Sequence, residues 1–126
     1  NFAGKYALTR AIEYALDLGL EWIEEKVKEL ASYKREKLAL IDGITVTDAG
    51  SEKCGIVSFT SERYPASRIV TLMAEKKINL SSSTAFGTRI DMESRQLPDL
   101  LRSSVHYYNS KKEIDRLIEE LEILHR

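Results

Sequence analysis

The run from Leu101 to Asn109 constrains the fold most, because a strand-like apolar pattern leads from it directly into a helix start. Ser110 and Glu113 fit a capping box, in which the serine caps the first helical turn and the glutamate reaches back. Arg102 stands within the strand, where an unpaired guanidinium is costly to bury. It therefore indicates either a binding site for a carboxylate or phosphate, or a salt bridge at the domain surface.

Composition is that of an ordinary single-domain protein. The 126 residues are 43% hydrophobic and 31% charged, with a net charge of −1, so we expect no nucleic-acid partner. No apolar run approaches the roughly 20 residues of a membrane span, and we expect no membrane partner. The single cysteine, Cys54, cannot form an internal disulfide, which favours a cytoplasmic protein.

The first third of the chain has a helical pattern. Apolar spacing predicts one helix over about 6–18, a break at Gly19, and a second helix over about 20–41 with one apolar stripe. We expect the opposite face of the second helix to be solvated, and its charged residues are Glu24, Glu25, Lys28, Glu29, Lys34 and Glu36.

The rest of the chain alternates between short strands and helices. Strands are expected at about 44–47, 56–60, 78–82 and 101–108. Val57 and Phe59 should share one face of the second strand. A helix is predicted to begin at Pro65, and another follows Ser110.

The stretch 81–98 is polar, so we predict a long loop with a short helical turn at 91–95. The chain is then a single domain with an α/β (α+β) two-layer sandwich over 42–126. Its small, mostly antiparallel sheet has about three to four strands with helices on one face. The long N-terminal helices over 1–41 precede it.

Several segments resemble the C-terminal small domain of the class V aminotransferases, which are pyridoxal-phosphate enzymes that include cysteine desulfurases, selenocysteine lyases and isopenicillin N epimerase-like enzymes. The matching segments are Arg102-Ser103-Ser104, Tyr108-Asn109-Ser110, Glu113-Ile114-Asp115-Arg116-Leu117, Gly55-Ile56-Val57-Ser58-Phe59 and Asn1-Phe2-Ala3-Gly4. The likeness runs in order along nearly the whole chain. It implies a parent enzyme that acts on an amino acid by transamination, epimerisation or elimination.

The resemblance also implies that a large domain precedes this chain and that the parent enzyme is a homodimer. The chain begins at Asn1 without a methionine, so we expect a fragment of a longer protein, with a start methionine or tag removed by processing as the alternative. The large domain would carry pyridoxal phosphate and the lysine that holds it. We therefore expect this fragment to bind no cofactor and to be inactive by itself.

By the same resemblance, Arg102 is the anchor for the substrate carboxylate. The hydroxyl-rich segment is a possible active-site loop that could bind substrate or a cofactor phosphate, and its residues are Ser81, Ser82, Ser83, Thr84, Thr88 and Arg89. His106 is expected on the strand face of Arg102, either as a wall of the site or as a partly buried structural residue. His106 and His125 are the only histidines, and their spacing predicts no metal site.

The segment 81–98 lacks the cysteine that desulfurases carry in this region as their nucleophile. The sequence therefore predicts a parent that is not a standard cysteine desulfurase, and Cys54 is interpreted as a small core residue. Two alternatives remain open. One is a stand-alone α/β ligand-binding or interaction module without catalysis, and the other is a desulfurase that uses a thiol from elsewhere.

Overall fold

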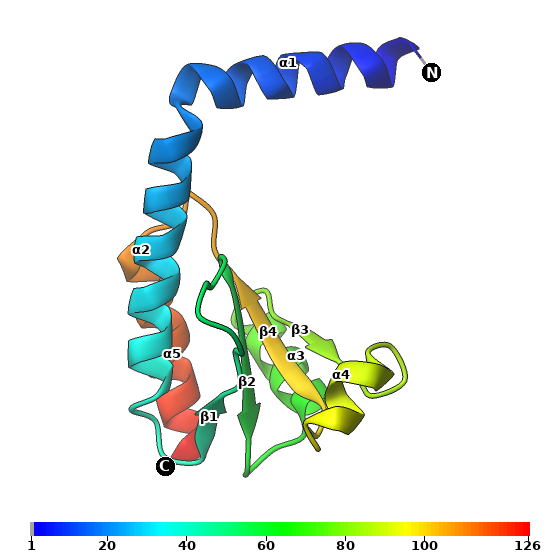
Figure 1. The fold of residues 1–126 in the computed structure, drawn as a ribbon. Helices are drawn as coiled ribbons and strands as arrows, with labels where there is room; N and C mark the ends of the chain where they lie inside the picture. Colours follow the sequence, from blue (N-terminus) through cyan, green and yellow to red (C-terminus); the bar gives the residue numbers. More distant parts are fainter. Residues whose placement is uncertain (1) are drawn as a thin grey trace.

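The computed structural model describes residues 2–126. Helices and strands follow one another in a mixed order (Figure 1). In chain order they are α1 (Phe2–Leu18), α2 (Leu20–Leu38), β1 (Ile44–Val46), β2 (Ile56–Ser61), α3 (Ala66–Glu75), β3 (Ser81–Ser83), α4 (Arg89–Ser94), β4 (Leu100–Ser104) and α5 (Lys111–His125). Across this described part of the chain, no helix has the length and apolar character that crossing a membrane requires.

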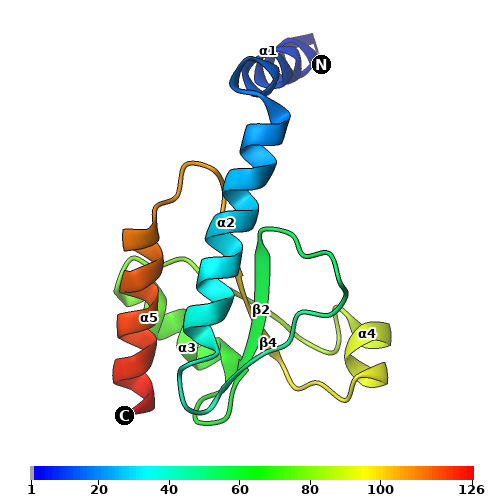
Figure 2. The ribbon, with the colours of Figure 1, turned by 60° about the vertical axis from the view of Figure 1, so that its left-hand side comes forward.

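The strands form one open sheet in the order β1-β2-β4-β3, and every neighbouring pair is antiparallel. Two long helices, α2 and α5, lie side by side against it (Figure 2). The predicted α/β fold with a small antiparallel sheet is confirmed. The hydrophobic pattern predicted this because half-buried strands and amphipathic helices must cover one another's apolar faces.

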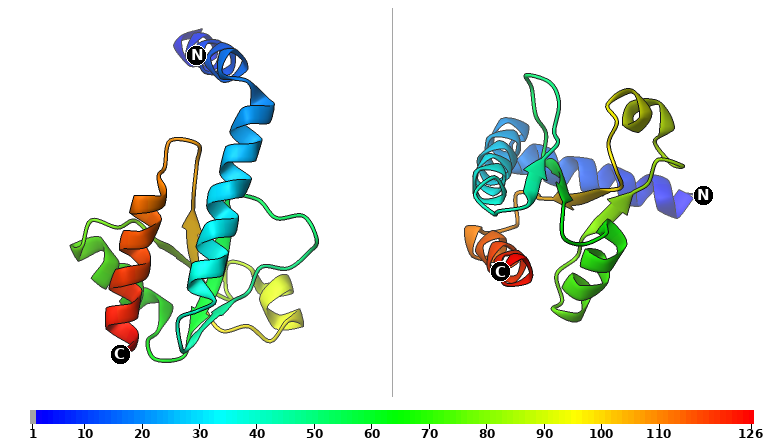
Figure 3. Two further views of the ribbon diagram at one scale, coloured as in Figure 1. Left: turned by 90° about the vertical axis from the view of Figure 1, so that its left-hand side faces the viewer. Right: turned by 90° about the horizontal axis from the view of Figure 1, so that it is seen from below.

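One face of the sheet carries the core. Val57, Phe59 and Leu101 are completely buried there, which confirms the predicted inward face of the second strand. Helices α2, α3 and α5 cover this face, whereas α4 and the 47–55 segment lie on the opposite side of the sheet (Figure 3). The prediction of helices on one face therefore holds for α2, α3 and α5, whereas α4 lies on the opposite face.

Helix α1 differs from the other helices because none of its described residues is buried. Figure 1 shows it turned sharply away from α2 at Gly19. Gly19 has a φ of 90°, a left-handed conformation that suits glycine, so the break expected there is confirmed. Its N–H still donates to the carbonyl oxygens of Ala15 and Leu16, at 3.2 and 3.1 Å, which closes the end of α1.

The start of α5 has the expected capping box. The Ser110 hydroxyl accepts from the backbone N–H of Glu113 at 3.4 Å, and the Ser110 N–H donates to the Glu113 carboxylate at 2.7 Å. The Tyr33 hydroxyl joins α2 to α5 by donating to Asp115 at 2.6 Å. That hydrogen bond raises the pKa of Tyr33 above its ordinary value. The last helix is thus fixed both at its cap and along its length.

Several predicted boundaries are wrong. The second helix ends at Leu38 rather than 41, and the third strand covers Ser81–Ser83 rather than 78–82. The predicted loop 81–98 therefore begins with a strand, whereas the helical turn predicted at 91–95 is present as α4. These short elements have weak local patterns, and their pairing with β4 or packing against it decides their structure.

The last strand ends at Ser104, not at Tyr108. The cause is a turn closed by Asn109, whose side chain accepts from the backbone N–H of His106 at 2.8 Å. The Asn109 N–H in turn donates to the His106 carbonyl at 3.0 Å. Residues 105–108 therefore leave the sheet, although Val105 continues the apolar alternation.

Lys34 is also not on a solvated face. It is only 1% exposed and lies beneath β4. The sequence carried a signal for this position, since Lys34 stands four residues after Leu30 and four before Leu38, both buried. It therefore belongs to the buried stripe of α2.

Candidate functional site

Strand β4 presents opposite chemistry on its two faces. Leu101 and Ser103 are buried against the helices, at 0% and 5% exposure, whereas Arg102 and Ser104 are exposed. Successive side chains of a strand point to opposite faces, so Arg102 lies on the face away from the main core. The candidate site is this open face around Arg102.

The sheet register places a serine on each side of Arg102. Ser58 of β2 and Ser81 of β3 are its cross-strand partners. Directly opposed residues have neighbouring side chains, so two hydroxyl groups flank the guanidinium. Within residues 2–126, the side chain of Arg102 forms no hydrogen bond or ion pair with the protein. Its donors are therefore available to a bound carboxylate or phosphate.

The nearby acidic group is already neutralised. Arg35 Nε lies 2.6 Å from Asp48 Oδ2, and the backbone N–H and hydroxyl of Ser58 donate to Asp48 Oδ1 at 2.8 and 2.6 Å. Burial raises the pKa of Asp48, but the Ser58 hydrogen bonds and the Arg35 pair outweigh it and hold the pKa below its usual value. Asp48 is thus engaged by Arg35, and it also fixes the position of Ser58.

The structure brings only part of the predicted loop onto the face of Arg102. Ser81 is opposite Arg102, and Ser83 shares its face by alternation. Ser82 is opposite Leu101 and therefore points to the other face of the sheet. The role of these hydroxyls toward a ligand remains a prediction.

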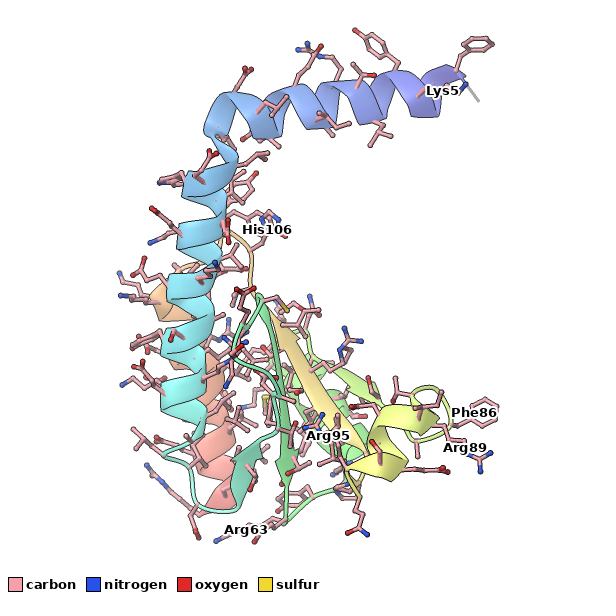
Figure 4. All side chains as sticks on the ribbon, viewed as in Figure 1. Lys5, Arg63, Phe86, Arg89, Arg95 and His106 are labelled. Carbon is pink, nitrogen blue, oxygen red and sulfur yellow. The ribbon has the colours of Figure 1, made fainter. Side chains whose placement is uncertain are left out.

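The other loop residues belong to α4 and its approach. Thr88 donates to the Thr84 carbonyl at 3.1 Å, and Arg89 pairs with Glu93 at 2.7 Å. Figure 4 shows Arg89 and Phe86 projecting outward from this corner of the molecule. Thr88 and Arg89 therefore make their hydrogen bonds within the α4 region, and their role toward a ligand remains a prediction.

Arg95 holds α4 beside the sheet. Its guanidinium donates to the Thr47 carbonyl just after β1, and it pairs with Asp91 at 3.1 Å. Met92 and Leu100 are buried but lie outside the main core cluster, which fits α4 covering the start of β4 on the open side. Helix α4 thus forms one rim of the open face.

The prediction that His106 shares the strand face of Arg102 is wrong, because β4 ends before it. Its ring lies against Tyr107 and Tyr108, with centroids 4.6 and 4.9 Å away. Figure 4 shows it beyond the end of β4, beside the first half of α2. The prediction that His106 walls the site therefore loses the strand alternation on which it was based. The alternative of a partly buried residue is also wrong, because His106 is exposed.

The remaining candidates have structural surroundings. His125 is buried, and its ring nitrogens lie 2.8 Å from the Leu121 carbonyl and from the Ser61 hydroxyl. Cys54 is exposed rather than a core residue. In the described part of the chain, no group of three or more His, Cys, Asp or Glu side chains could hold a metal ion.

The open face suits an anion but not a covalently held aldehyde cofactor. It offers a guanidinium and hydroxyls, and none of the four strands contains a lysine. Lys34 is buried on the opposite side of β4, where its ammonium is 2.8 Å from the Ser103 hydroxyl. The residues of the open face therefore fit binding of a carboxylate or phosphate, and its strands contain no lysine of the kind that holds pyridoxal phosphate.

Comparison with known proteins decides the family. The model of the family "Aminotransferase class-V" matches residues 1–117. The chain belongs to this family. Class V aminotransferases use pyridoxal phosphate, and the sequence resemblance noted above is confirmed.

Named relatives of this class V chain are cysteine desulfurases. A probable cysteine desulfurase of Xylella fastidiosa is 29% identical over 121 residues, which are 96% of this chain and 29% of the relative. One from Halalkalibacterium halodurans is 29% identical over 120 residues, or 95% of this chain and 29% of the relative. The chain thus spans about three tenths of the length of these relatives.

Solved structures show the same fold. The cysteine desulfurase CsdA of Escherichia coli matches with a TM-score of 0.88 at 24% identity, over 98% of this chain and 30% of that chain. The apo cysteine desulfurase of Thermococcus onnurineus NA1 matches with a TM-score of 0.82 at 22% identity, over 90% and 28%. The names of the sequence relatives go against the prediction that the parent is not a standard cysteine desulfurase.

Proposed function

We propose that this chain is the C-terminal small domain of a pyridoxal-phosphate enzyme that acts on an amino acid, and that Arg102 binds the substrate carboxylate. The observation that carries the proposal is the exposed guanidinium of Arg102, flanked by Ser58 and Ser81 and without a partner among residues 2–126. A planar guanidinium can bind both oxygens of a carboxylate at once, which fixes orientation as well as position.

The proposed roles of this chain and of the preceding domain follow from the residues that this chain contains. Pyridoxal phosphate supplies an electron sink for bond breaking at the amino acid, and we assign its binding to a preceding large domain. Arg102 would hold the carboxylate in one orientation, and Ser81 and Ser83 would donate hydrogen bonds beside it. Helix α4 would form the wall or lid of the site, because Arg95 holds it against the sheet on the open side.

A preceding domain would also explain why α1 has exposed apolar side chains. This helix has large apolar side chains in water, including Phe2 at 92% and Tyr6 at 71% exposure. Exposed apolar surface of this kind marks an interface. We propose that the large domain covers α1 and that the complete enzyme is a homodimer, as the resemblance implies.

The reaction itself has two candidates. The names of the relatives favour release of sulfur from cysteine. Segment 81–98 contains no thiol, which favours transamination, epimerisation or elimination instead. A desulfurase would then need a thiol from another segment.

The experiment uses the complete parent protein and its visible absorption spectrum with a panel of amino acids. We expect a cofactor band that shifts with the substrate, and a shift that Arg102→Ala abolishes at the same concentration. Arg68→Ala is the matched control, because Arg68 is exposed on α3, away from the open face, and should leave the shift unchanged.

The carbon product formed from cysteine by the same protein, with a thiol reductant present, separates the two reactions. Alanine, with the sulfur reduced to sulfide by the thiol, would assign the desulfurase reaction. Pyruvate with sulfide, or a spectral shift with another amino acid and no alanine from cysteine, would assign the alternative chemistry. A colourless parent that binds no pyridoxal phosphate would overturn the enzyme proposal and leave the stand-alone binding module.

A further inference from the structure

A cavity lies behind β4, on the side of the sheet away from Arg102. Its volume is about 380 Å³, within the range of pockets that bind small molecules. It is bounded by the end of β4, the connection from α3 to β3, and the first turns of α5. The polar residues at its wall are Lys34, Lys77, Asn79, Ser103, Ser104, Tyr108, Asn109, Glu113 and Arg116.

Lys34 is the unusual member of this wall. It is 1% exposed, and its ammonium donates to the carbonyl and hydroxyl oxygens of Ser103, at 3.0 and 2.8 Å. An ammonium has three N–H donors, so these two bonds leave one donor over. In the described part of the chain, Lys34 forms no ion pair with a carboxylate.

The charges around the cavity are predominantly positive. Lys34, Lys77 and Arg116 border it, against the single carboxylate of Glu113. Glu113 is already engaged by the backbone N–H and the hydroxyl of Ser110, at 2.7 and 3.0 Å. Arg116 uses one guanidinium nitrogen on the Lys76 carbonyl, at 2.6 Å, and keeps further donors.

Burying a cation without a counter-ion carries a large desolvation penalty. Burial, with a smaller contribution from Arg35, lowers the pKa of Lys34 to about 8, and the carboxylate of Asp48 only partly opposes this. At neutral pH most of the Lys34 side chain is still protonated. A negative ion at its remaining donor would compensate the charge.

We propose that this cavity binds a small oxyanion, a phosphate or a carboxylate, against the ammonium of Lys34. Arg116 and Lys77 would add positive charge, and the Tyr108 hydroxyl would add a donor. Ser103 and Arg102 point to opposite faces of β4, so this site is separate from the proposed substrate anchor and does not depend on it.

The test is a titration of the chain with inorganic phosphate and, separately, with acetate, at constant ionic strength maintained with chloride. We expect a saturable rise in Tm with at least one of them, and the tighter one identifies the class of anion. Lys34→Met should weaken binding at least tenfold, and Arg116→Gln should weaken it several-fold. Lys28→Met is the matched control, because this exposed lysine of the same helix pairs with Glu24 and should have no effect.

Proton uptake gives a second readout that a change in stability would not mimic. Calorimetry at pH 8.5 in two buffers of different ionisation enthalpy should show uptake of part of a proton when the tighter anion binds, because the anion stabilises the ammonium. Glu113, Lys77, Tyr108 and Arg116 face the same cavity, so loss of the uptake in Lys34→Met assigns it to this lysine. A non-saturable response, equal binding by Lys34→Met, or no uptake would each overturn the proposal.

Discussion

The two faces of β4 use adjacent residues for different purposes. Leu101 and Ser103 are covered by the helices, and Lys34 binds Ser103 from below. Arg102 and Ser104 lie exposed on the other face, where Arg102 has no protein partner among the described residues. One strand thus serves both stability and, in our proposal, recognition. Substitutions on the two faces should therefore have separable effects.

The largest effect on stability is expected on the covered face. Leu101 is fully buried, so Leu101→Ala removes packed atoms and leaves a cavity. The free energy of unfolding should fall by about 4 kcal/mol. Urea denaturation followed by circular dichroism measures this. A loss below about 1 kcal/mol would mean that the covered face is not the core.

Lys34 should make the stability of the covered face depend on pH. Its pKa is about 8 in the folded state, against an ordinary value of 10.5. Between these values the unfolded chain binds the extra proton, so the free energy of unfolding should rise with pH, by up to about 3 kcal/mol. This gain in the free energy of unfolding should be lost as the pH falls from 10.5 back through 8.

The comparison with Lys34→Met isolates this contribution. The difference in unfolding free energy between the wild-type chain and Lys34→Met should change over pH 8 to 10.5, whereas other titrating groups, such as Tyr33, act in both proteins. A constant difference over this range would show that Lys34 is not shifted in the folded state.

The smallest effect is expected on the open face. Arg102→Ala should change the free energy of unfolding by less than about 0.5 kcal/mol, because the side chain is exposed and has no protein partner among the described residues. The same urea titration measures this. A loss above about 1.5 kcal/mol would indicate that Arg102 is a structural residue after all.

The sequence predicted the features that depend on local pattern. Alternation identified the buried face of Val57 and Phe59, and the spacing of Ser110 and Glu113 identified the capped start of α5. These signals lie within a few residues of one another, so the hydrophobic period and the capping chemistry are sufficient.

The features that the sequence did not reveal depend on distant partners. Three consecutive serines form β3 only because β4 offers an unpaired edge, and Asn109 ends β4 by a side-chain hydrogen bond. The charge on Lys34 concealed its place on the buried stripe of α2. Within the candidate site, Arg102 could be predicted from its strand, but not the Ser58 and Ser81 hydroxyls beside it, which come from the register of two other strands.

The central claim, that Arg102 binds the substrate carboxylate, is tested most directly by a chemical comparison in the complete parent enzyme. The affinity for its amino-acid substrate is compared with that for the matching amine, which lacks the carboxylate, in the wild type and in Arg102→Ala. We predict that the wild type prefers the amino acid by about 100-fold, as expected for a charged hydrogen-bonded pair, and that the variant loses this preference. An undiminished preference in Arg102→Ala would contradict the account.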